Sequence, residues 1–284
     1  MKHFLKAVLP ATLIRRVKRF IRPYMKRVGE LLYEQGGRLI RKSEVRQFEK
    51  PLFREYTGDN GSVMNCCVAY NQHGGYCVPL SSFQRPAAQR ILQGDVYEPE
   101  TIEYIRKVCG SGDIIHAGTY FGDFIPALSI SCSGKVWAFE PNPENYRCSE
   151  ITISINGAEN VELENAALGN SSDYVPLRVK NSSGASAGGN SSVELDSAPD
   201  AETVRTRVVR IDDIIPEERR ISLLQLDVEG FEKQALSGGF ETIERWTPIL
   251  ILEEVPPEEW MHETLLELGY EYERDLHHNT VWKA

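Results

Sequence analysis

Residues 223–232, with the sequence LLQLDVEGFE, decide the fold of this chain. A short apolar run leads into the acidic residues Asp227 and Glu229, and Gly230 then ends the run before a helical pattern begins. An apolar run of this kind, closed by a turn signal, predicts a buried parallel strand. Ligands of an open α/β sheet bind at the carboxyl ends of its strands. We therefore expect Asp227 and Glu229 to lie in a functional site.

A second strand-to-loop junction occurs earlier in the chain, at residues 113–123 (DIIHAGTYFGD). Outward from these two junctions, strands and helices alternate at short spacing. The predicted strands are 113–118, 135–140, 161–167, 222–228 and 248–253. The predicted helices are 99–108, 123–132, 143–155, 231–238 and 257–268, and residues 270–274 and 280–283 would form an antiparallel hairpin at the sheet edge. This alternation predicts an α/β fold with right-handed βαβ units and a mostly parallel sheet.

The alternation stops between residues 169 and 212. Segments 174–179 and 204–211 look like strands, and Pro176 would confine the first of them to a sheet edge because proline cannot donate to the ladder. Between them, ten of the twelve residues 181–192 are Ser, Gly or Asn, a composition that cannot build a core. Two interpretations stay open for this stretch, a flexible hairpin tip and a lid or substrate loop.

The composition, with 41% hydrophobic and 26% charged residues, is typical of a globular protein. No run of about eighteen apolar residues is present, which argues against a membrane span. The cysteines show neither a CxxC pair nor the spacing of metal ligands, so we predict reduced, mostly buried thiols in a cytoplasmic protein. They are Cys66, Cys67, Cys77, Cys109, Cys132 and Cys148.

The net charge of −9 is unevenly distributed. The first fifty residues contain fourteen of the 32 Lys and Arg residues but only four of the 41 Asp and Glu residues. We predict a basic helical arm at 1–55, a hairpin and lead-in at 56–96 and the main domain at 97–284. The arm would be an amphipathic helix at the surface of an anionic membrane, or a helix packed on the acidic body or on a second copy of the chain. The acidic body argues against nucleic-acid binding.

The turn after the first strand of the main domain carries features of an adenosine-cofactor site. Gly118 and Gly122 bracket this turn, and Glu140 ends the next strand, where an acid can accept the hydroxyls of a ribose. Tyr120 stands where a dinucleotide site has its second glycine, which disfavours a pyrophosphate and a nicotinamide-dependent oxidoreductase. The turn is compatible with S-adenosylmethionine. Asn165 follows the third strand at the level of an adenine amino group.

Together these stretches resemble the FkbM family of methyltransferases. The resemblance spans about Tyr97 to Trp282, and its most specific part is the D-x-E-G-F-E block that begins at Asp227. It implies a class I methyltransferase (Rossmann-like) fold with a seven-stranded, mostly parallel sheet. It also implies S-adenosylmethionine as the cofactor and methylation of a hydroxyl, often on a sugar or a polyketide-like natural product.

Carried over by position, the resemblance implies contacts of Gly118 and Gly122 with the methionine end of the cofactor. The ribose would lie at Glu140 and the adenine near Asn165, while Asp227 and Glu229 would face the methyl group and the acceptor. His116 departs from the pattern, because the family usually has an acid there that helps to bind the cofactor's amino group. Our candidate to compensate is Asp123, on the far side of the turn from His116.

For the chemistry, Glu229 is the first candidate for a general base and Asp227 the second, since two nearby carboxylates raise the pKa of one of them. In the alternative, Asp227 only orients the cofactor and Glu229 caps the following helix. The alternative function is a non-catalytic adenosyl-cofactor-binding scaffold, motivated by His116. Glu253 and Glu254 add oxygen atoms that could ligate a divalent ion, at most one of them on the site's side of a strand, but we predict no metal.

Overall fold

The computed structural model describes residues 56–57, 63–64, 66–180, 187, 189, 191–193 and 203–284. The chain divides into two compact units, Met1–Glu49 and Lys50–Ala284. The predicted basic arm and most of the Ser-, Gly- and Asn-rich stretch lie outside the described residues, so both interpretations of each remain predictions. Within the described part of the chain, no helix has the length and apolar character needed to cross a bilayer.

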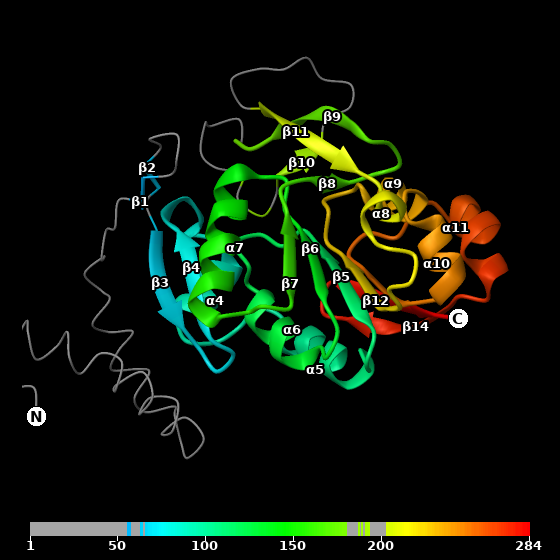
Figure 1. Ribbon diagram of the computed structural model, residues 1–284, viewed down its shortest axis with the longest axis horizontal. Helices are drawn as coiled ribbons and strands as arrows, with labels where there is room; N and C mark the ends of the chain where they lie inside the picture. The colour runs from blue at the N-terminus through cyan, green and yellow to red at the C-terminus, as the bar shows by residue number, and fades with distance from the viewer. Residues whose placement is uncertain are drawn as a thin grey trace, which may run out of the picture. The chain divides into compact units, whose positions relative to one another are not determined.

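Seven strands form the main sheet (Figure 1). Their order is β14 (Glu271–Leu276), β15 (Asn279–Lys283), β13 (Ile249–Leu252), β12 (Ile221–Leu226), β5 (Asp113–Ala117), β6 (Val136–Phe139) and β7 (Val161–Glu164). Five neighbouring strands, β13, β12, β5, β6 and β7, are parallel to one another. Strand β15 runs antiparallel to both β13 and β14. The seven-stranded, mostly parallel sheet of a class I methyltransferase fold, with its antiparallel edge hairpin, is therefore confirmed.

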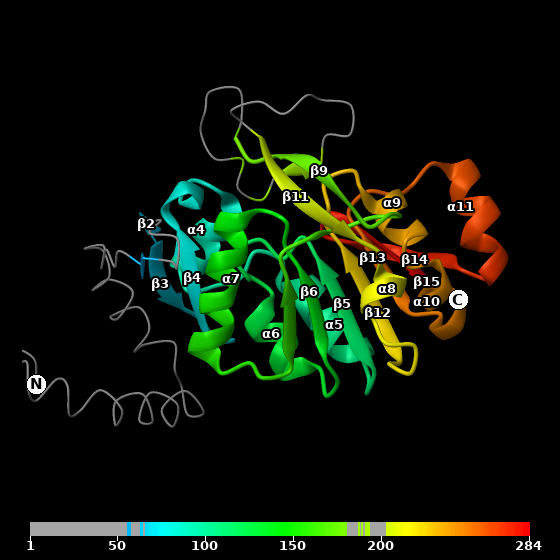
Figure 2. The ribbon, with the colours of Figure 1, turned by 45° about the horizontal axis from the view of Figure 1, so that its top comes forward.

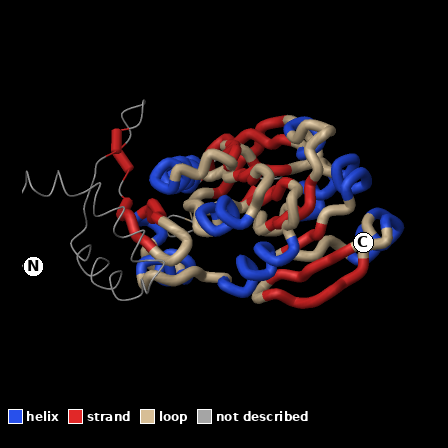
Figure 3. The backbone as a smooth tube through the Cα atoms, turned by 60° about the horizontal axis from the view of Figure 1, so that its bottom comes forward, coloured by secondary structure: helices blue, strands red, loops and turns tan. Residues whose placement is uncertain are grey.

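Helices cover both faces of this sheet, because consecutive strand residues point to opposite sides (Figure 3). On one side, α4 (Pro86–Leu92), α5 (Pro99–Val108), α6 (Ile125–Ser131) and α7 (Pro143–Asn156) share a core with Ile114 and Leu223. On the other side, α8 (Ile211–Ile214), α9 (Glu232–Ser237), α10 (Phe240–Trp246) and α11 (Glu258–Thr264) share a core with Ile115 and Leu224. The predicted helix 257–268 is divided into α11 and a 3₁₀ turn, Leu266–Leu268.

Helix boundaries follow signals that are visible in the sequence. Pro143 occupies the first turn of α7, where its missing N–H costs nothing, and the side chain of Asn142 accepts a hydrogen bond from the Glu144 backbone N–H at 2.9 Å. Gly157 ends the same helix in the left-handed conformation, with φ +60°. These caps position the start of α7 directly after β6, beside the ends of the parallel strands.

The predicted hairpin before the main domain is present as β3 (Cys66–Tyr70) and β4 (Gly75–Pro79), which follow the two-residue strands β1 (Tyr56–Thr57) and β2 (Val63–Met64). The β3–β4 hairpin contacts α7 through a hydrogen bond that the Cys77 backbone N–H donates to the Thr152 hydroxyl, at 3.0 Å. A short 3₁₀ turn, Leu80–Ser82, leads from the hairpin toward α4. All six cysteines are buried and form no disulfide, as the sequence predicted.

A second, smaller sheet has the order β10 (Ser192–Val193), β9 (Asp173–Arg178), β11 (Thr203–Val209) and β8 (Ala167–Leu168). The predicted third strand, 161–167, is therefore split, because β7 ends at Glu164 and Ala167 pairs with Val208 in the smaller sheet. The prediction of an edge strand at Pro176 was wrong, since β9 lies between β11 and β10. However, β10 pairs only with Leu177 and Arg178, so Pro176 needs no donor on that side. Figure 2 shows β9 and β11 together above the ends of β5 and β6.

Candidate functional site

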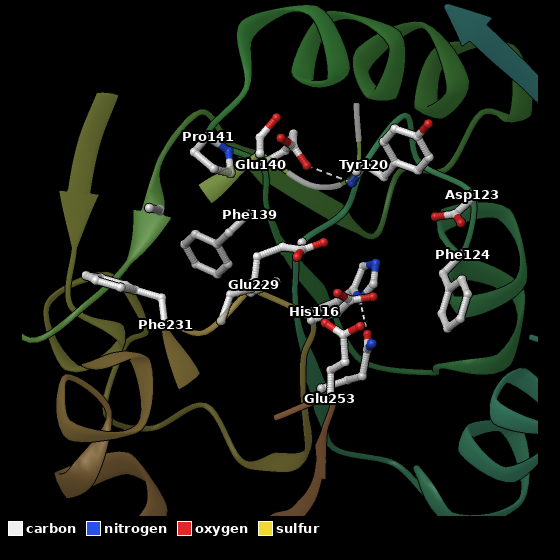
Figure 4. A pocket seen from close by; sticks show the side chains of 18 of the residues that line it. His116, Tyr120, Asp123, Phe124, Phe139, Glu140, Pro141, Glu229, Phe231 and Glu253 are labelled. Carbon is white, nitrogen blue, oxygen red and sulfur yellow. Dashed lines mark hydrogen bonds between the residues drawn. The ribbon is translucent and has the colours of Figure 1, made fainter. Parts of the chain in front are cut away.

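A cavity of about 370 Å³ opens where β5, β6 and β12 end (Figure 4). Its volume falls within the range of roughly 300–1,000 Å³ that is usual for small-molecule sites. The wall is built by the strand ends of the main sheet, by the smaller sheet, and by the lead-in segment before β5. The predicted site residues on this wall are His116, Gly118, Tyr120, Asp123, Glu140, Asp227 and Glu229.

Position 118 must be a glycine because the backbone that follows β12 leaves no room for a side chain there. It has φ +81°, and a Cβ atom built on it would lie 1.7 Å from the carbonyl oxygen of Asp227. Only a residue without a side chain lets the turn after β5 lie this close to the backbone after β12. The contact brings the turn and Asp227 to the same end of the cavity.

Tyr120 and Glu140 form a direct link between the turn and the end of β6. The Tyr120 backbone, in a left-handed conformation at φ +55°, donates its N–H to one carboxylate oxygen of Glu140 at 2.7 Å. The other carboxylate oxygen accepts the Asn142 N–H at 2.8 Å. Burial raises the pKa of Glu140 to about 8, against the opposing effect of these hydrogen bonds. The carboxyl group is thus held rigidly on the cavity wall, where it can accept hydroxyl protons of a ligand.

His116 is buried at the end of β5 and is held on two sides. Its Nδ1 forms a hydrogen bond with the Gln225 side-chain oxygen on β12, and its ring stacks on Phe124 with centroids 5.6 Å apart. Its Nε2 atom is buried and has no hydrogen-bond partner. Burial lowers the pKa of His116 to about 4, so the ring is neutral near pH 7. His116 therefore cannot replace the negative charge that the resemblance expects at this position.

Asp123 lies beyond the turn, close to Glu98 at the start of α5, and both line the cavity. Burial, followed by the charge of Glu98, raises the pKa of Asp123 to about 7. A cationic ligand group at this end of the cavity would stabilise the ionised form of both carboxyl groups. Asp123 thus lies on the cavity wall beyond the turn, and its role as a substitute for the missing acid at His116 stays a prediction.

Three carboxyl groups lie together at the ends of β12 and β13. One oxygen atom each of Asp227, Glu229 and Glu253 lies within 4.8 Å of the others. Burial raises the pKa of Asp227 well above its usual range, with further contributions from a hydrogen bond shared with Glu253 and from the charges of its acidic neighbours. Glu254 is exposed and does not line the cavity, as the alternation of side chains along a strand predicts.

Such a group of oxygen atoms could hold a divalent cation, because hard cations prefer carboxylate ligands. A metal ion is not needed to explain why the carboxyl groups of Asp227 and Glu253 lie close together. These two groups form a hydrogen bond, and two carboxyl groups can approach each other when they share a proton. The arrangement also suits proton abstraction, because the Glu229 carboxyl group points into the cavity (Figure 4).

Two predicted residues do not reach the cavity wall. Gly122 packs against α7, where an added Cβ would lie 3.2 Å from the side chain of Thr152. Asn165 is exposed, and its amide donates to the Glu140 carbonyl at 2.8 Å. Asn165 therefore braces the loop that carries Glu140, and its position gives no support to the predicted adenine contact.

Several lining residues were not predicted. Arg85, Tyr97 and Glu98 come from the stretch between β4 and β5, whose contribution to the site no motif indicated. The apolar part of the wall includes Phe139, Pro141, Leu168, Leu177, Val193 and Phe231. Phe139, Pro141 and Phe231 could have been found, because they lie beside Glu140 or within the acidic block. Leu168, Leu177 and Val193 depend on how the smaller sheet packs.

Comparison with known proteins gives one family. A family model described as "Methyltransferase FkbM domain" matches residues 116–272, more than half of the chain. No curated protein matches.

Several solved structures are similar at low identity. A methyltransferase FkbM from Methylobacillus flagellatus KT is 17% identical, with a TM-score of 0.40, and the match covers 64% of this chain and 50% of that one. A SAM-dependent methyltransferase from Aquifex aeolicus is 14% identical, with a TM-score of 0.35 and coverages of 65% and 87%. The tRNA (uracil-54, C5)-methyltransferase of Pyrococcus abyssi, in complex with S-adenosyl-L-homocysteine, is 12% identical, with a TM-score of 0.38 and coverages of 73% and 41%. The match thus spans half the length of the Methylobacillus protein.

Proposed function

Because the chain belongs to the FkbM family of methyltransferases, we propose that it transfers a methyl group from S-adenosylmethionine to a hydroxyl group of a sugar or natural-product acceptor. S-adenosylmethionine is the expected cofactor of such a protein. The observation that carries the proposal is a single cavity that joins the buried carboxyl group of Glu140 to the carboxyl groups of Asp227 and Glu229. The first can bind a ribose, and the others can face a reacting centre.

The cavity has parts that suit an adenosine. Glu140 can accept two ribose hydroxyls, because its oxygen atoms are held in place by the backbone of Tyr120 and Asn142. The apolar wall nearby, including Phe139 and Phe231, suits the faces of an adenine ring. The buried, unpartnered Nε2 of His116 marks a further place where a ligand donor would be accepted.

The bound cofactor supplies an electrophilic methyl group on a good leaving group, so the protein has mainly to align the acceptor. Alignment of this kind can contribute roughly 7–11 kcal/mol to the lowering of the barrier. A base that removes the hydroxyl proton adds about 10²–10⁴-fold. We assign this base to Glu229, since its carboxyl group points into the cavity, and keep Asp227 as the second candidate because its proton is shared with Glu253.

The test uses the full chain with S-adenosylmethionine carrying a radiolabelled methyl group. The acceptors are hydroxylated sugars and polyketide-type alcohols, each paired with the corresponding amine. We expect label on the hydroxyl compounds, and a loss of kcat of about 10²–10⁴-fold in Glu229→Gln without a change in S-adenosylhomocysteine affinity. Transfer to amines alone would reject the hydroxyl acceptor.

The matched control is Glu254→Gln, which changes an exposed acid outside the cavity and should keep full activity. If Glu229→Gln turns over as fast as the unaltered chain, Glu229 is not the base. If the chain binds S-adenosylhomocysteine but transfers no methyl group to any acceptor, the non-catalytic scaffold is the better function.

A further inference from the structure

The two sides of the smaller sheet differ in character. Residues that pair directly across neighbouring strands lie on the same side of a sheet. On the inner side, Leu177 of β9 pairs with Val204 of β11 and with Val193 of β10. Leu177 and Val193 line the cavity. The outer side carries the alternate residues of β9 and β11, which lie next to each other in the sheet (Figure 2). One side of this sheet therefore belongs to the candidate site, and the other lies outside it.

The outer side is basic, whereas the body of the chain is acidic. After residue 50 the chain has eighteen of the 32 Lys and Arg residues and thirty-seven of the 41 Asp and Glu residues. Three arginines nevertheless gather on this surface, and the exposed Lys180 follows Arg178 by two residues. A cluster of positive charge on an acidic body attracts a negatively charged partner. The residues that pair across the outer side are Tyr174, Pro176, Arg178, Thr203, Arg205 and Arg207.

Two of these arginines are held in place by their neighbours. The Arg205 guanidinium lies over the ring of Tyr174, 4.3 Å from the ring centroid. Arg207 forms an ion pair with Glu164, at the end of β7. Arg205 is exposed and Tyr174 is 53% exposed, so a ligand can reach both the guanidinium and the ring. An arginine that is already ordered loses less side-chain entropy when it binds an anionic group.

An exposed tyrosine beside arginines suits a charged sugar. A guanidinium binds a carboxylate through two parallel hydrogen bonds, and the apolar face of a sugar ring packs on an aromatic ring. A nucleic acid also stacks on aromatic rings, but it carries a phosphate on every unit. Glu164 and the exposed Asp173 flank the arginines and would repel such a dense row of phosphates. The surface therefore favours a glycan that carries carboxylate groups.

Strand β10 connects the outer side of the smaller sheet to the cavity. Ser192 pairs with Arg178 on the outer side. The chain neighbours of Ser192, which are Ser191 and Val193, line the cavity. The amide of Asn142 donates to the Ser191 hydroxyl at 2.9 Å and so holds this segment against the start of α7. A two-residue strand at the edge of the sheet thus separates the arginines from the candidate site.

We propose that the outer side of the smaller sheet binds the methyl acceptor, and that this acceptor is a polysaccharide whose sugars carry carboxylate groups. The charged sugars bind Arg178 and Arg205 and pack on Tyr174. A neighbouring part of the same polysaccharide crosses β10 and brings a hydroxyl group into the cavity. The inference rests on the proposed function and narrows its acceptor to a polymer, because a single sugar cannot occupy both sides of a sheet.

Binding of labelled oligosaccharides to the full chain, measured by fluorescence anisotropy, tests the surface. The probes are an oligomer of galacturonic acid, with a carboxylate on each sugar, and a neutral glucose oligomer of equal length. The acidic oligomer should bind about tenfold or more tightly than the neutral one. The double variant Arg178→Gln/Arg205→Gln should weaken its binding about tenfold or more. Tyr174→Ser should weaken it about threefold or more, whereas Tyr174→Phe keeps the ring and should stay within about twofold.

The basic residues 1–50 attract any polyanion, so the comparison is made between variants of the full chain. The matched control is Arg106→Gln/Arg274→Gln, which removes two exposed arginines from other parts of the second compact unit. The control should stay within about twofold of the unaltered chain. Equal losses in both double variants would show that net charge alone decides the affinity, and would overturn the proposal. So would a loss of binding to anionic vesicles or single-stranded DNA while binding to the acidic oligomer is kept.

Methyl transfer separates this proposal from the proposed function. With the acidic oligomer as acceptor, Arg178→Gln/Arg205→Gln should raise KM about tenfold and leave the affinity for S-adenosylhomocysteine within about twofold. If the chain methylates hydroxyl compounds but the double variant has an unchanged KM for the acidic oligomer, the docking surface is wrong while the function stands. If the chain neither binds S-adenosylhomocysteine nor methylates any acceptor, the proposed function fails, and the acceptor assignment fails with it.

Discussion

At position 118, any side chain would collide with the neighbouring strand. The Cβ of an alanine would lie 1.7 Å from the Asp227 carbonyl, and φ is +81°. We therefore expect Gly118→Ala to lower the free energy of unfolding by about 3 kcal/mol or more, measured by urea denaturation. Gly110 is a matched control, since it also has positive φ (+58°) but nothing within 4 Å. Gly110→Ala should cost only about 1–2 kcal/mol, and equal losses in both variants would contradict the collision.

The buried His116 makes the free energy of unfolding of the chain decrease as the pH falls. Its pKa falls from 6.5 to about 4 because of burial, so below pH 6.5 the unfolded chain binds a proton that the folded chain does not. As the pH falls from about 6.5 to 4, the chain should lose about 1.4 kcal/mol of unfolding free energy per pH unit relative to His116→Asn. Denaturation curves across this range measure the difference. Parallel pH profiles would show that the ring is not buried as a neutral group.

Among single residues, a place on the cavity wall was easier to predict than a particular contact. The acidic block and the glycine turn identified Asp227, Glu229, Gly118 and Glu140, all of which line one cavity. Asn165 was placed by its height along a strand, but its amide is used by the Glu140 carbonyl. A side chain's final partner depends on the loop across from it, which no local spacing encodes.

At the level of elements, the ends of β12 and β13 bring three carboxyl groups together. We expect a chelator such as EDTA to leave methyl transfer unchanged, because the proton shared by Asp227 and Glu253 already lowers the charge of the group. Turnover before and after chelation measures this. A loss of activity that Mg²⁺ restores would instead assign the three carboxylates to a divalent cation.

Elements with strong local signals were predicted nearly to their ends. The apolar run of β12 and the Pro143 start of α7 needed no tertiary information. The third strand was predicted too long, and β9 was placed at an edge. Both errors arise from pairing in the smaller sheet, in which Ala167 meets Val208 and Leu177 meets Val193. Such partners lie far apart in the chain, and hydrophobic patterning does not reveal them.

For the whole molecule, every described residue on the cavity wall lies between Arg85 and Glu253, within the second compact unit. We expect removal of residues 1–49 to leave the thermal midpoint of that unit and its affinity for S-adenosylhomocysteine unchanged. Differential scanning fluorimetry and calorimetry measure the two quantities. A weaker affinity in the shortened chain would show that the basic segment contributes to the site.

By itself, the sequence determined the alternation of strands and helices, and with it the edge of the sheet where the candidate site lies. Those features follow from apolar runs, prolines and glycines that act over a few residues. The tertiary structure decided which side chains share the cavity. It brought in Arg85, Glu98 and Glu253 and left out Gly122 and Asn165. Membership of a cavity depends on strand register and on the packing of distant segments, and these are settled only when the whole core forms.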